Sequence, residues 1–553
     1  MKVLPQGFVA ACSVAWWLLT PAPAVAQRTV CTITVNSPDE QETFRRYLPE
    51  PGHRFVELVE RGRPDWLASA CRASVACDVL IISAHYDGGN NFFSDRIELN
   101  ESLTVDELER ASCSDSCPSL FSRLKEVYLF GCNTLNPEPQ SGASAEIVRS
   151  LVREGHAPKE AQRQLRALNG AHGESSRDRM RQIFNEVPVI YGFASTAPLG
   201  PVAGATLNRY FRAAGAREIG QARPSSRLMD AFAAYGLTAA GGIGENTALA
   251  QARADMCQFA DERLSTATKL AFVHELLQRH VGEARLQLDR IQRLTATLDE
   301  TARRQPVVAQ ALEDIARDAP ARTRVLDYAR NAEPPVQVRL LGLARDVGWL
   351  SEPEHRDALA ATLRQLQGRT ALEISDVDLA CTLNRDRRLD GAINRRVAPA
   401  SLADDLPHAA VRACLGSSED RARTLQALFG GDEDDVRIAQ AYLRHRPIAD
   451  EAELRAIASA IARMPPSVAQ VLALDALARH YMSDRDALQE LVHLFSRTPS
   501  WAVQAAVAGI LIRADRRALS SVELVAVLSR DRRPAPDGAD EMIDALIRTL
   551  QTP

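Results

Sequence analysis

A change of pattern near residue 250 divides this chain into two parts of different fold class. Strand and helix signals alternate from residue 28 onward, whereas beyond that point helical signals follow one another with short polar breaks. The runs at 79–82 and 127–130 are continuously apolar, as expected of strands buried on both faces of a sheet. Such alternation predicts a mostly parallel sheet covered by helices. We therefore expect an α/β domain over residues 28–250 and an all-α domain over 257–553, with the boundary in or just after the Gly-rich stretch 236–246.

Caps and short apolar runs predict the other elements of the first domain. Ser37 as N-cap and Glu40 as its capping-box partner predict a helix that runs to about Tyr47. The polar stretch 168–181 is expected to be a surface loop. Further strands are expected at 30–35, 54–59 and 187–193, and further helices at 65–73, 104–111, 144–153 and 207–214.

A weak internal repeat runs through the helical part. Ala439, Ala473 and Ala506 occupy matching positions in three helical segments, 34 and 33 residues apart. Small residues at such positions let paired helices pack closely, and periods of this size are typical of solenoids. The pattern resembles HEAT-like helical repeats, which implies a surface for a protein partner or a long substrate. An irregular all-helical domain is the alternative.

The first residues have the features of an export signal. Lys2 is followed by an apolar stretch at 8–20 and by the small-x-small site Ala24-Val25-Ala26, so residues 1–26 are predicted to be a signal peptide. The alternative, an uncleaved anchor, is disfavoured because the stretch is short for a bilayer span of about 20 residues. We expect an exported protein, periplasmic or extracellular, with no membrane insertion after cleavage.

Export would place the cysteines in an oxidising compartment, where disulfides form. The chain has ten, and removal of Cys12 with the signal peptide leaves nine. An oxidising compartment would pair an even set, so the count is compatible with four disulfides and one free thiol. The count does not say which thiol is free. Proximity in the chain suggests two pairs, Cys381 with Cys414 and Cys113 with Cys117.

The charge of the chain argues against two classes of partner. The formal net charge is −5 and no run of Lys or Arg forms a basic tract. Nucleic acid and anionic membrane surfaces are therefore not expected partners.

Two strands of the predicted sheet end in reactive side chains. The run at 81–83 leads through Ala84 to His85, and the run at 128–130 leads through Gly131 to Cys132. Active sites in open α/β sheets lie beyond the carboxyl ends of the strands, so these side chains can converge on one substrate bond. A thiolate attacks an acyl carbon, and an imidazole moves the protons.

The residues after His85 suggest further roles. The tetrahedral oxyanion needs preorganised donors, and the amide of Cys132 and an amide of Gly88 or Gly89 are candidates. Asp87 could orient an imidazole, bind a cationic side chain or cap a turn.

The order of these motifs resembles the caspase-like fold, and within it the CHAT-type branch. A strand with His85 and a Gly-rich turn, a polar hairpin region at 92–103 and a helix with the TVDEL pattern precede the strand with Gly-Cys-Asn-Thr. The resemblance implies that His85 is the general base and acid and Cys132 the nucleophile of a cysteine endopeptidase that needs no cofactor. It also implies a protein or peptide substrate, and a pocket lined by the next strand, which places Ser195 and Thr196 near the substrate.

Two residues depart from the family pattern. Gly usually follows the histidine directly, and this chain has Tyr86 there, with the glycines two residues later. Some relatives that cleave after basic residues carry Asp two positions before the cysteine, where this chain has Phe130. A basic preference is therefore not supported by that position.

Other interpretations remain open. The run Ser83-Ala84-His85-Tyr86-Asp87 is similar to the His-x-Asp run of exported zinc aminopeptidases, but no Glu-Glu pair follows it, so no metal site is predicted. A cysteine at a strand end can equally be a small buried residue or half of a disulfide. The rival to a peptidase is a non-catalytic envelope binding or scaffold protein with a degenerate caspase-like domain.

Overall fold

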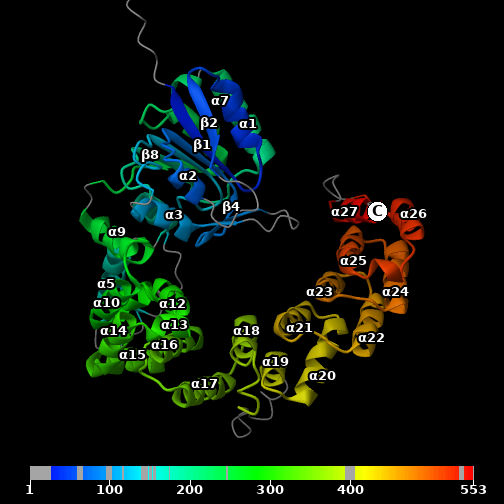
Figure 1. The fold of residues 1–553 in the computed structure, drawn as a ribbon. Coiled ribbons are helices and arrows are strands. Elements are labelled where there is room, and N and C mark those ends of the chain that lie inside the picture. Colours follow the sequence, from blue (N-terminus) through cyan, green and yellow to red (C-terminus); the bar gives the residue numbers. More distant parts are fainter. Residues whose placement is uncertain are drawn as a thin grey trace, which may run out of the picture. The chain divides into compact units, whose positions relative to one another are not determined.

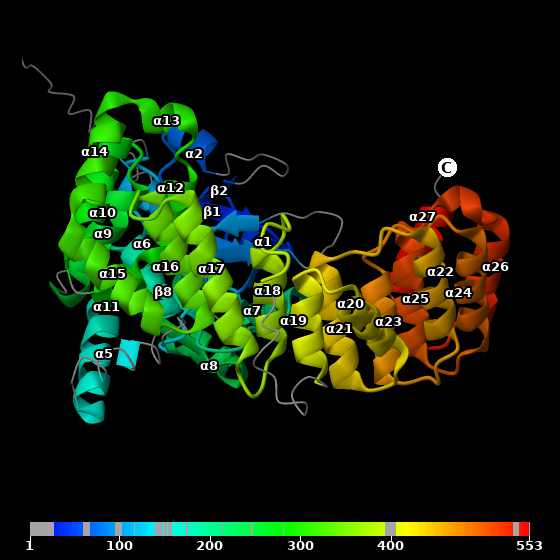
Figure 2. The ribbon, with the colours of Figure 1, turned by 90° about the horizontal axis from the view of Figure 1, so that it is seen from below.

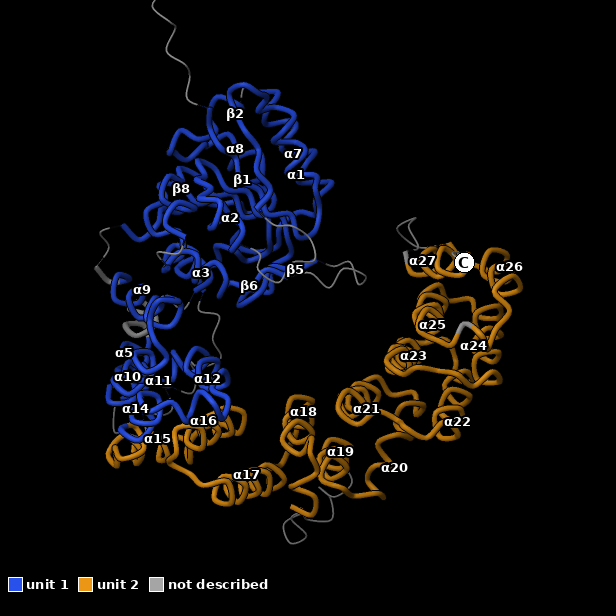
Figure 3. Tube along the Cα trace, in the orientation of Figure 1, with its two compact units in different colours: residues 1–314 blue, residues 315–553 orange. Residues whose placement is uncertain are grey.

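The computed structural model describes most of the chain. It covers residues 27–58, 67–94, 102–114, 117–138, 147–148, 152, 157–172, 175–213, 215–244, 247–279, 281–392, 405–534 and 541–551. These residues form two compact units that divide between Asp314 and Ile315 (Figure 3). The first unit is α/β and the second consists of helices, so the two classes of structure predicted from the sequence are both present.

A six-stranded sheet forms the centre of the first unit. Its neighbouring strands pair in parallel, except that the last, β9, runs antiparallel to β8. In spatial order the strands are β2 (His53–Glu57), β1 (Arg28–Thr34), β3 (Val79–Ser83), β7 (Glu126–Phe130), β8 (Val189–Phe193) and β9 (Leu237–Ala240).

The sheet is buried on both faces, as its continuous apolar runs predict. Leu80 and Ile82 of β3 pack into one hydrophobic cluster, while Val79 and Ile81 pack into another on the opposite face. Successive side chains of a strand point to opposite faces, so both clusters draw on the same strands. One face is covered by α1 (Asp39–Tyr47), α7 (Gly200–Arg212) and α8 (Ser226–Ala231), and the other by α2 (Ala68–Arg72), α3 (Val105–Cys113) and α6 (Ser176–Ile183) (Figure 1).

A second, small sheet follows β3. It is antiparallel and consists of β4 (His85–Tyr86), β5 (Asn91–Phe93) and β6 (Ser102–Thr104). This is the hairpin expected within 92–103. The polar stretch 168–181 is not a loop throughout, because it contains the end of α5 (Pro158–His172) and the first residues of α6.

Several helices after the sheet belong to the first unit. They are α9 (Thr247–Ala260), α10 (Thr266–Gln278), α11 (Val281–Leu286), α12 (Leu288–Ala296) and α13 (Glu300–Arg304), and α14 (Pro306–Arg317) crosses the division. A disulfide joins Cys113 of α3 to Cys257 of α9, and Arg290 of α12 pairs with buried Glu109 of α3 at 2.9 Å. The first unit therefore extends past residue 257, the predicted start of the helical domain.

The described part of the second unit consists of helices and the segments that join them. Its helices are α15 (Ala319–Asn331), α16 (Pro334–Asp346), α17 (Glu352–Gln367), α18 (Ile374–Leu383), α19 (Leu406–Cys414), α20 (Ser418–Gln426), α21 (Glu433–His445), α22 (Glu451–Ala462), α23 (Val468–Leu477), α24 (Arg485–Arg497), α25 (Trp501–Arg513), α26 (Ser521–Asp531) and α27 (Glu541–Gln551).

From α21 onward the helices of the second unit form two layers. Helices α21, α23, α25 and α27 contact one another in succession, as do α22, α24 and α26 in a second layer, which Figures 1 and 2 show end-on and lengthwise. Ala439, Ala473 and Ala506 are all buried where α21, α23 and α25 pack. The side-chain amides of Gln470 and Gln504, 34 residues apart, each donate to a carbonyl near the end of the preceding helix. The same contact thus recurs with the period seen in the sequence.

Four disulfides join eight of the described cysteines. They are Cys31–Cys77, Cys71–Cys117, Cys113–Cys257 and Cys381–Cys414. The predicted pair Cys381–Cys414 is confirmed. The pair Cys113–Cys117 is wrong, because the end of α3 faces α9 while Cys117 faces α2.

The disulfides are consistent with an exported protein. The predicted signal peptide, residues 1–26, lies outside the described residues. Among the residues that the structure does describe, none of the helices has the length and apolar character needed to cross a bilayer.

Candidate functional site

Strand register brings the two reactive side chains to the same level of the sheet. β3 and β7 are neighbours, and Ser83 is paired with Phe130. His85 and Cys132 each follow that pair by two residues, beyond the carboxyl end of their strands. The convergence expected from the two motifs is therefore present in the backbone.

The residues on either side of Cys132 fix this close approach. A Cβ at Gly131 would lie 3.0 Å from the carbonyl oxygen of Ala84 and 3.1 Å from Cβ of Tyr86, so a larger residue would push the two strand ends apart. Asn133 has a φ of +58°, a left-handed conformation in which Asn is enriched. Cys132 thus sits on a sharp turn directly after β7.

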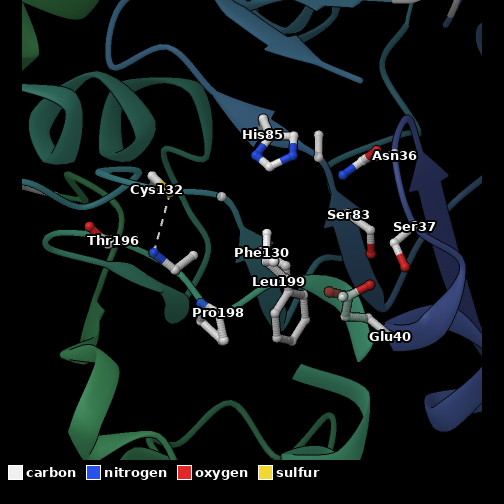
Figure 4. A pocket seen from close by; sticks show the side chains of 14 residues that line it. Asn36, Ser37, Glu40, Ser83, His85, Phe130, Cys132, Thr196, Pro198 and Leu199 are labelled. Atoms are coloured by element: carbon white, nitrogen blue, oxygen red, sulfur yellow. Dashed lines mark hydrogen bonds between the residues drawn. The ribbon is translucent and has the colours of Figure 1, made fainter. Parts of the chain in front are cut away.

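His85 and Cys132 line one pocket of about 170 Å³ (Figure 4). Its other walls come from the ends of β1 and β3 and from the segment 196–200 before α7. Figure 4 shows Cys132 and Thr196 on one side, Ser37, Glu40 and Ser83 gathered on the other, and Phe130 between them.

Cys132 is the free cysteine among the described residues, and its side chain is half-buried. Its sulfur accepts a hydrogen bond from the backbone N–H of Ala197 at 3.3 Å. The loop that carries this donor is held to the cysteine turn because the N–H of Asn133 donates to the carbonyl of Ser195 at 2.7 Å. Thr196 lines the pocket, whereas the exposed Ser195 reaches the site through its backbone.

The imidazole of His85 is half-buried at the start of β4. It lies beside the ring of Phe93 of β5, with 5.5 Å between the ring centres. The small antiparallel sheet thus forms one side of the histidine position, because His85 and Phe93 are directly paired across β4 and β5.

Asp87, Gly88 and Gly89 form a turn outside the lining of this pocket. The Asp87 carboxylate accepts the N–H groups of Gly89, Asn90 and Asn91 at 2.8–3.0 Å. Burial acts to raise the pKa of Asp87, but these donors outweigh it and lower the pKa. Of the three roles considered for Asp87, the observed one is turn capping, and the Gly89 amide is already engaged there.

Two residues that no sequence motif indicated, Ser176 and Arg179, also hold this turn in place. Ser176 donates to the carbonyl of Gly88 at 2.9 Å, and Arg179 donates to that of Gly89 at 2.6 Å. Both lie in α6, within the stretch expected to be a loop. The hydroxyl of Tyr86 also donates to the Gly89 carbonyl, at 3.0 Å.

Glu40 does not form the predicted capping box with Ser37. The N-cap of α1 is Pro38 and no capping box forms, because Ser37 instead hydrogen-bonds to Asp39. A Cβ at Gly200 would lie 2.1 Å from the Ser37 hydroxyl, so the start of α7 packs directly on that side chain. Glu40 turns into the pocket and is 3% exposed.

Burial changes the proton affinity of Glu40. It raises the pKa of the carboxyl to about 7, against the lowering effects of the residue's own backbone N–H and of the Ser83 hydroxyl beside it, and the neighbouring Asp39 adds to the rise. The Ser83 hydroxyl is close enough to act on the carboxyl, but neither Oε2 of Glu40 nor Oγ of Ser83 makes a well-aligned hydrogen bond to any described residue.

Neither metal ligands nor known relatives identify the site. Within the described ranges no group of three or more His, Cys, Asp or Glu side chains is placed to hold a metal ion. No protein-family model matches the chain, and neither the curated proteins nor the solved structures include a match.

Proposed function

We propose that the first unit is a caspase-like cysteine peptidase domain of the CHAT type, with Cys132 as nucleophile and His85 as general base and acid. The observation that carries the proposal is that the free thiol among the described cysteines shares a pocket with a histidine from the neighbouring strand end. The order of strands, with a small antiparallel sheet between the histidine and cysteine strands, is compatible with this family.

The chemistry follows from the two side chains. His85 takes the proton of the Cys132 thiol, and the thiolate attacks the carbonyl carbon of the scissile peptide bond. His85 then gives the proton to the leaving amine as the C–N bond breaks, which leaves a thioester on Cys132. Water, deprotonated by His85, hydrolyses this thioester and regenerates the thiol.

The Cys132 amide is the oxyanion donor that we favour, because it lies at the turn between strand and nucleophile. A Gly88 amide would have to reach the site from outside the pocket lining. The N–H of Ala197 already contacts the sulfur and would stabilise a thiolate there.

We also propose that the layered helices of the second unit are HEAT-like repeats that bind a protein partner or select the substrate. The recurring alanine and glutamine contacts support a repeat, and stacked repeats present extended surfaces of this kind. The proposal concerns binding and assigns no chemistry to these helices.

The test compares the oxidised, mature protein with single variants on a library of fluorogenic peptides. We expect Cys132→Ala to lower kcat/KM by at least ~10⁴-fold and His85→Gln by roughly 10²–10⁴-fold. His493→Gln, an exposed histidine on α24, is the matched control and should leave kcat/KM unchanged.

Alkylation with iodoacetamide gives a readout that needs no substrate. We expect the peptide that contains Cys132 to be labelled in the oxidised protein, and His85→Gln to slow the labelling. If Cys132→Ala retains full proteolysis, the peptidase proposal is wrong. If the wild type cleaves no peptide and its thiol reacts no faster than a model thiol, the binding or scaffold interpretation is favoured instead.

A further inference from the structure

The end of the pocket away from Cys132 contains polar atoms that the protein leaves unsatisfied. Glu40 and Ser83 are 3% and 2% exposed, and both line the pocket. Oε2 of Glu40 and Oγ of Ser83 have no hydrogen-bond partner among the described residues. Buried polar atoms are nearly always hydrogen-bonded, and leaving Oε2 of Glu40 and Oγ of Ser83 without partners is unfavourable. A ligand group that supplies the partner would remove that cost.

The lining contains no cation of its own. Among the described residues that form the pocket, the ionisable side chains are Glu40, His85 and Cys132, and no Lys or Arg is present. Asp39, next to Glu40 on α1, adds negative charge from the same helix. When Glu40 is ionised, its complementary charge therefore has to come with the ligand.

The walls between the two ends of the pocket are apolar. Phe130, Pro198 and Leu199 line the space between Cys132 and Glu40 (Figure 4). A volume of about 170 Å³ holds one extended side chain. A side chain that satisfies both the walls and the far end needs an aliphatic stem with a cationic head, which describes lysine and arginine.

We propose that this pocket binds the Lys or Arg side chain that precedes the scissile bond, and that Glu40 is the residue that determines this specificity. The inference rests on the proposed peptidase function and adds its substrate class. Ser83 accepts a further N–H of the cationic head. The carboxylate that recognises the cation is on α1. The preference therefore does not require an Asp two residues before the cysteine, where this chain has Phe130.

The proton affinity of Glu40 makes the preference depend on pH. Because its pKa is about 7 in the substrate-free protein, the carboxylate is largely protonated at pH 6 and largely ionised at pH 8. A Lys substrate and its norleucine counterpart share the same bond-breaking step, so the ratio of their kcat/KM values cancels any effect of pH on that step and isolates Glu40. We expect this ratio to rise about tenfold from pH 6 to pH 8.

The experiment uses fluorogenic peptides that differ at one residue, namely Lys, Arg, Gln, citrulline or norleucine before the scissile bond. In the wild type we expect kcat/KM for Lys and Arg to exceed that for the neutral residues by about 100-fold. Glu40→Gln should lower the Lys and Arg values by about 100-fold and change the norleucine value less than about 3-fold. Glu42→Gln, an exposed carboxyl on the same helix, is the matched control and should change neither.

The outcomes separate this inference from the function on which it rests. Cleavage that depends on Cys132 but favours Gln or norleucine overturns the role of Glu40 and leaves the peptidase proposal intact. A specificity ratio that stays flat from pH 6 to pH 8 in the wild type also overturns it, even if Glu40→Gln does not fold. If no peptide is cleaved and Cys132→Ala behaves as the wild type, both proposals fail together.

Discussion

Each of the two units is stabilised internally by contacts, and the contacts of the first unit join residues much farther apart in the sequence than those of the second. Three disulfides lie in the first unit and join residues 46, 46 and 144 positions apart, whereas the described disulfide of the second unit joins α18 to the next helix, 33 positions apart. The pocket of the first unit draws residues from 36 to 200, while helices of the second unit contact near neighbours in the chain. A sheet can therefore assemble a site from distant segments, and a helical stack extends a surface by repetition.

The largest effect should come from the longest disulfide. The double variant Cys113→Ala/Cys257→Ala opens a loop of 144 residues, which corresponds to about 5 kcal/mol of unfolding free energy in the chain-entropy account. Cys381→Ala/Cys414→Ala is the matched control in the second unit and should cost about 4 kcal/mol.

The two disulfide variants should differ more in where the protein is destabilised than in how much unfolding free energy is lost. Hydrogen exchange read peptide by peptide should rise across the first unit in Cys113→Ala/Cys257→Ala, and only near α18 and α19 in the control variant. If the rise in hydrogen exchange extended equally far in both variants, the proposed difference in contact range between the two units would be wrong.

A smaller effect is expected from acid through one buried carboxyl of the first unit. Glu109 is 3% exposed, and although burial acts to raise its pKa, Arg290 and Arg179 outweigh burial and lower the pKa to about 2. A carboxyl whose folded pKa lies below its unfolded value stabilises the fold above the unfolded pKa, near 4.5. That stability, on the order of 3 kcal/mol, is lost as the pH falls from about 4.5 to about 2.

Urea unfolding at pH 7, 4 and 3, followed by hydrogen exchange in the first unit, measures this loss. In Glu109→Gln the stability at pH 7 should be lower and its decline over the same pH range shallower. An unchanged decline would assign the acid sensitivity to other carboxyls.

The smallest effect concerns the repeat. Ala473 is fully buried between neighbouring helices, so Ala473→Leu adds volume where none is free and should cost about 1–3 kcal/mol. Ala456→Leu, on the exposed side of α22, is the control and should stay within about 0.5 kcal/mol. Thermal unfolding followed by the fluorescence of Trp349 and Trp501, both in the second unit, reports the difference. A destabilisation that spreads to the first unit would contradict the local character of the stack.

Local sequence patterns were sufficient to predict the buried strands and the closely packed helices. The apolar runs at 79–82 and 127–130 predicted two buried strands, and both are strands in which every residue is buried. The alanines at 439, 473 and 506 predicted closely packed helices, and all three are buried. These features could be predicted because each depends on side chains that are periodic along one segment.

Other features depend on partners far away in the chain. Cys113 is close to Cys117 in sequence, yet it bonds to Cys257, because α9 packs on α3. Ser37 and Glu40 have the spacing of a capping box, but the start of α7 occupies Ser37 and leaves Glu40 in the pocket. No local pattern signals either outcome.

The buried strands, the recurring helices and the two strand ends that carry His85 and Cys132 follow from hydrophobic periodicity and from motifs a few residues long, so they could be predicted from the chain alone. Three other features depend on folding: β3 and β7 are neighbours in register, Cys132 is outside the four disulfides, and Glu40 lies at the far end of the same pocket. Neighbouring strands of a parallel sheet are joined by crossovers of many residues, so the chemistry at the sheet edge depends on packing between segments distant in sequence.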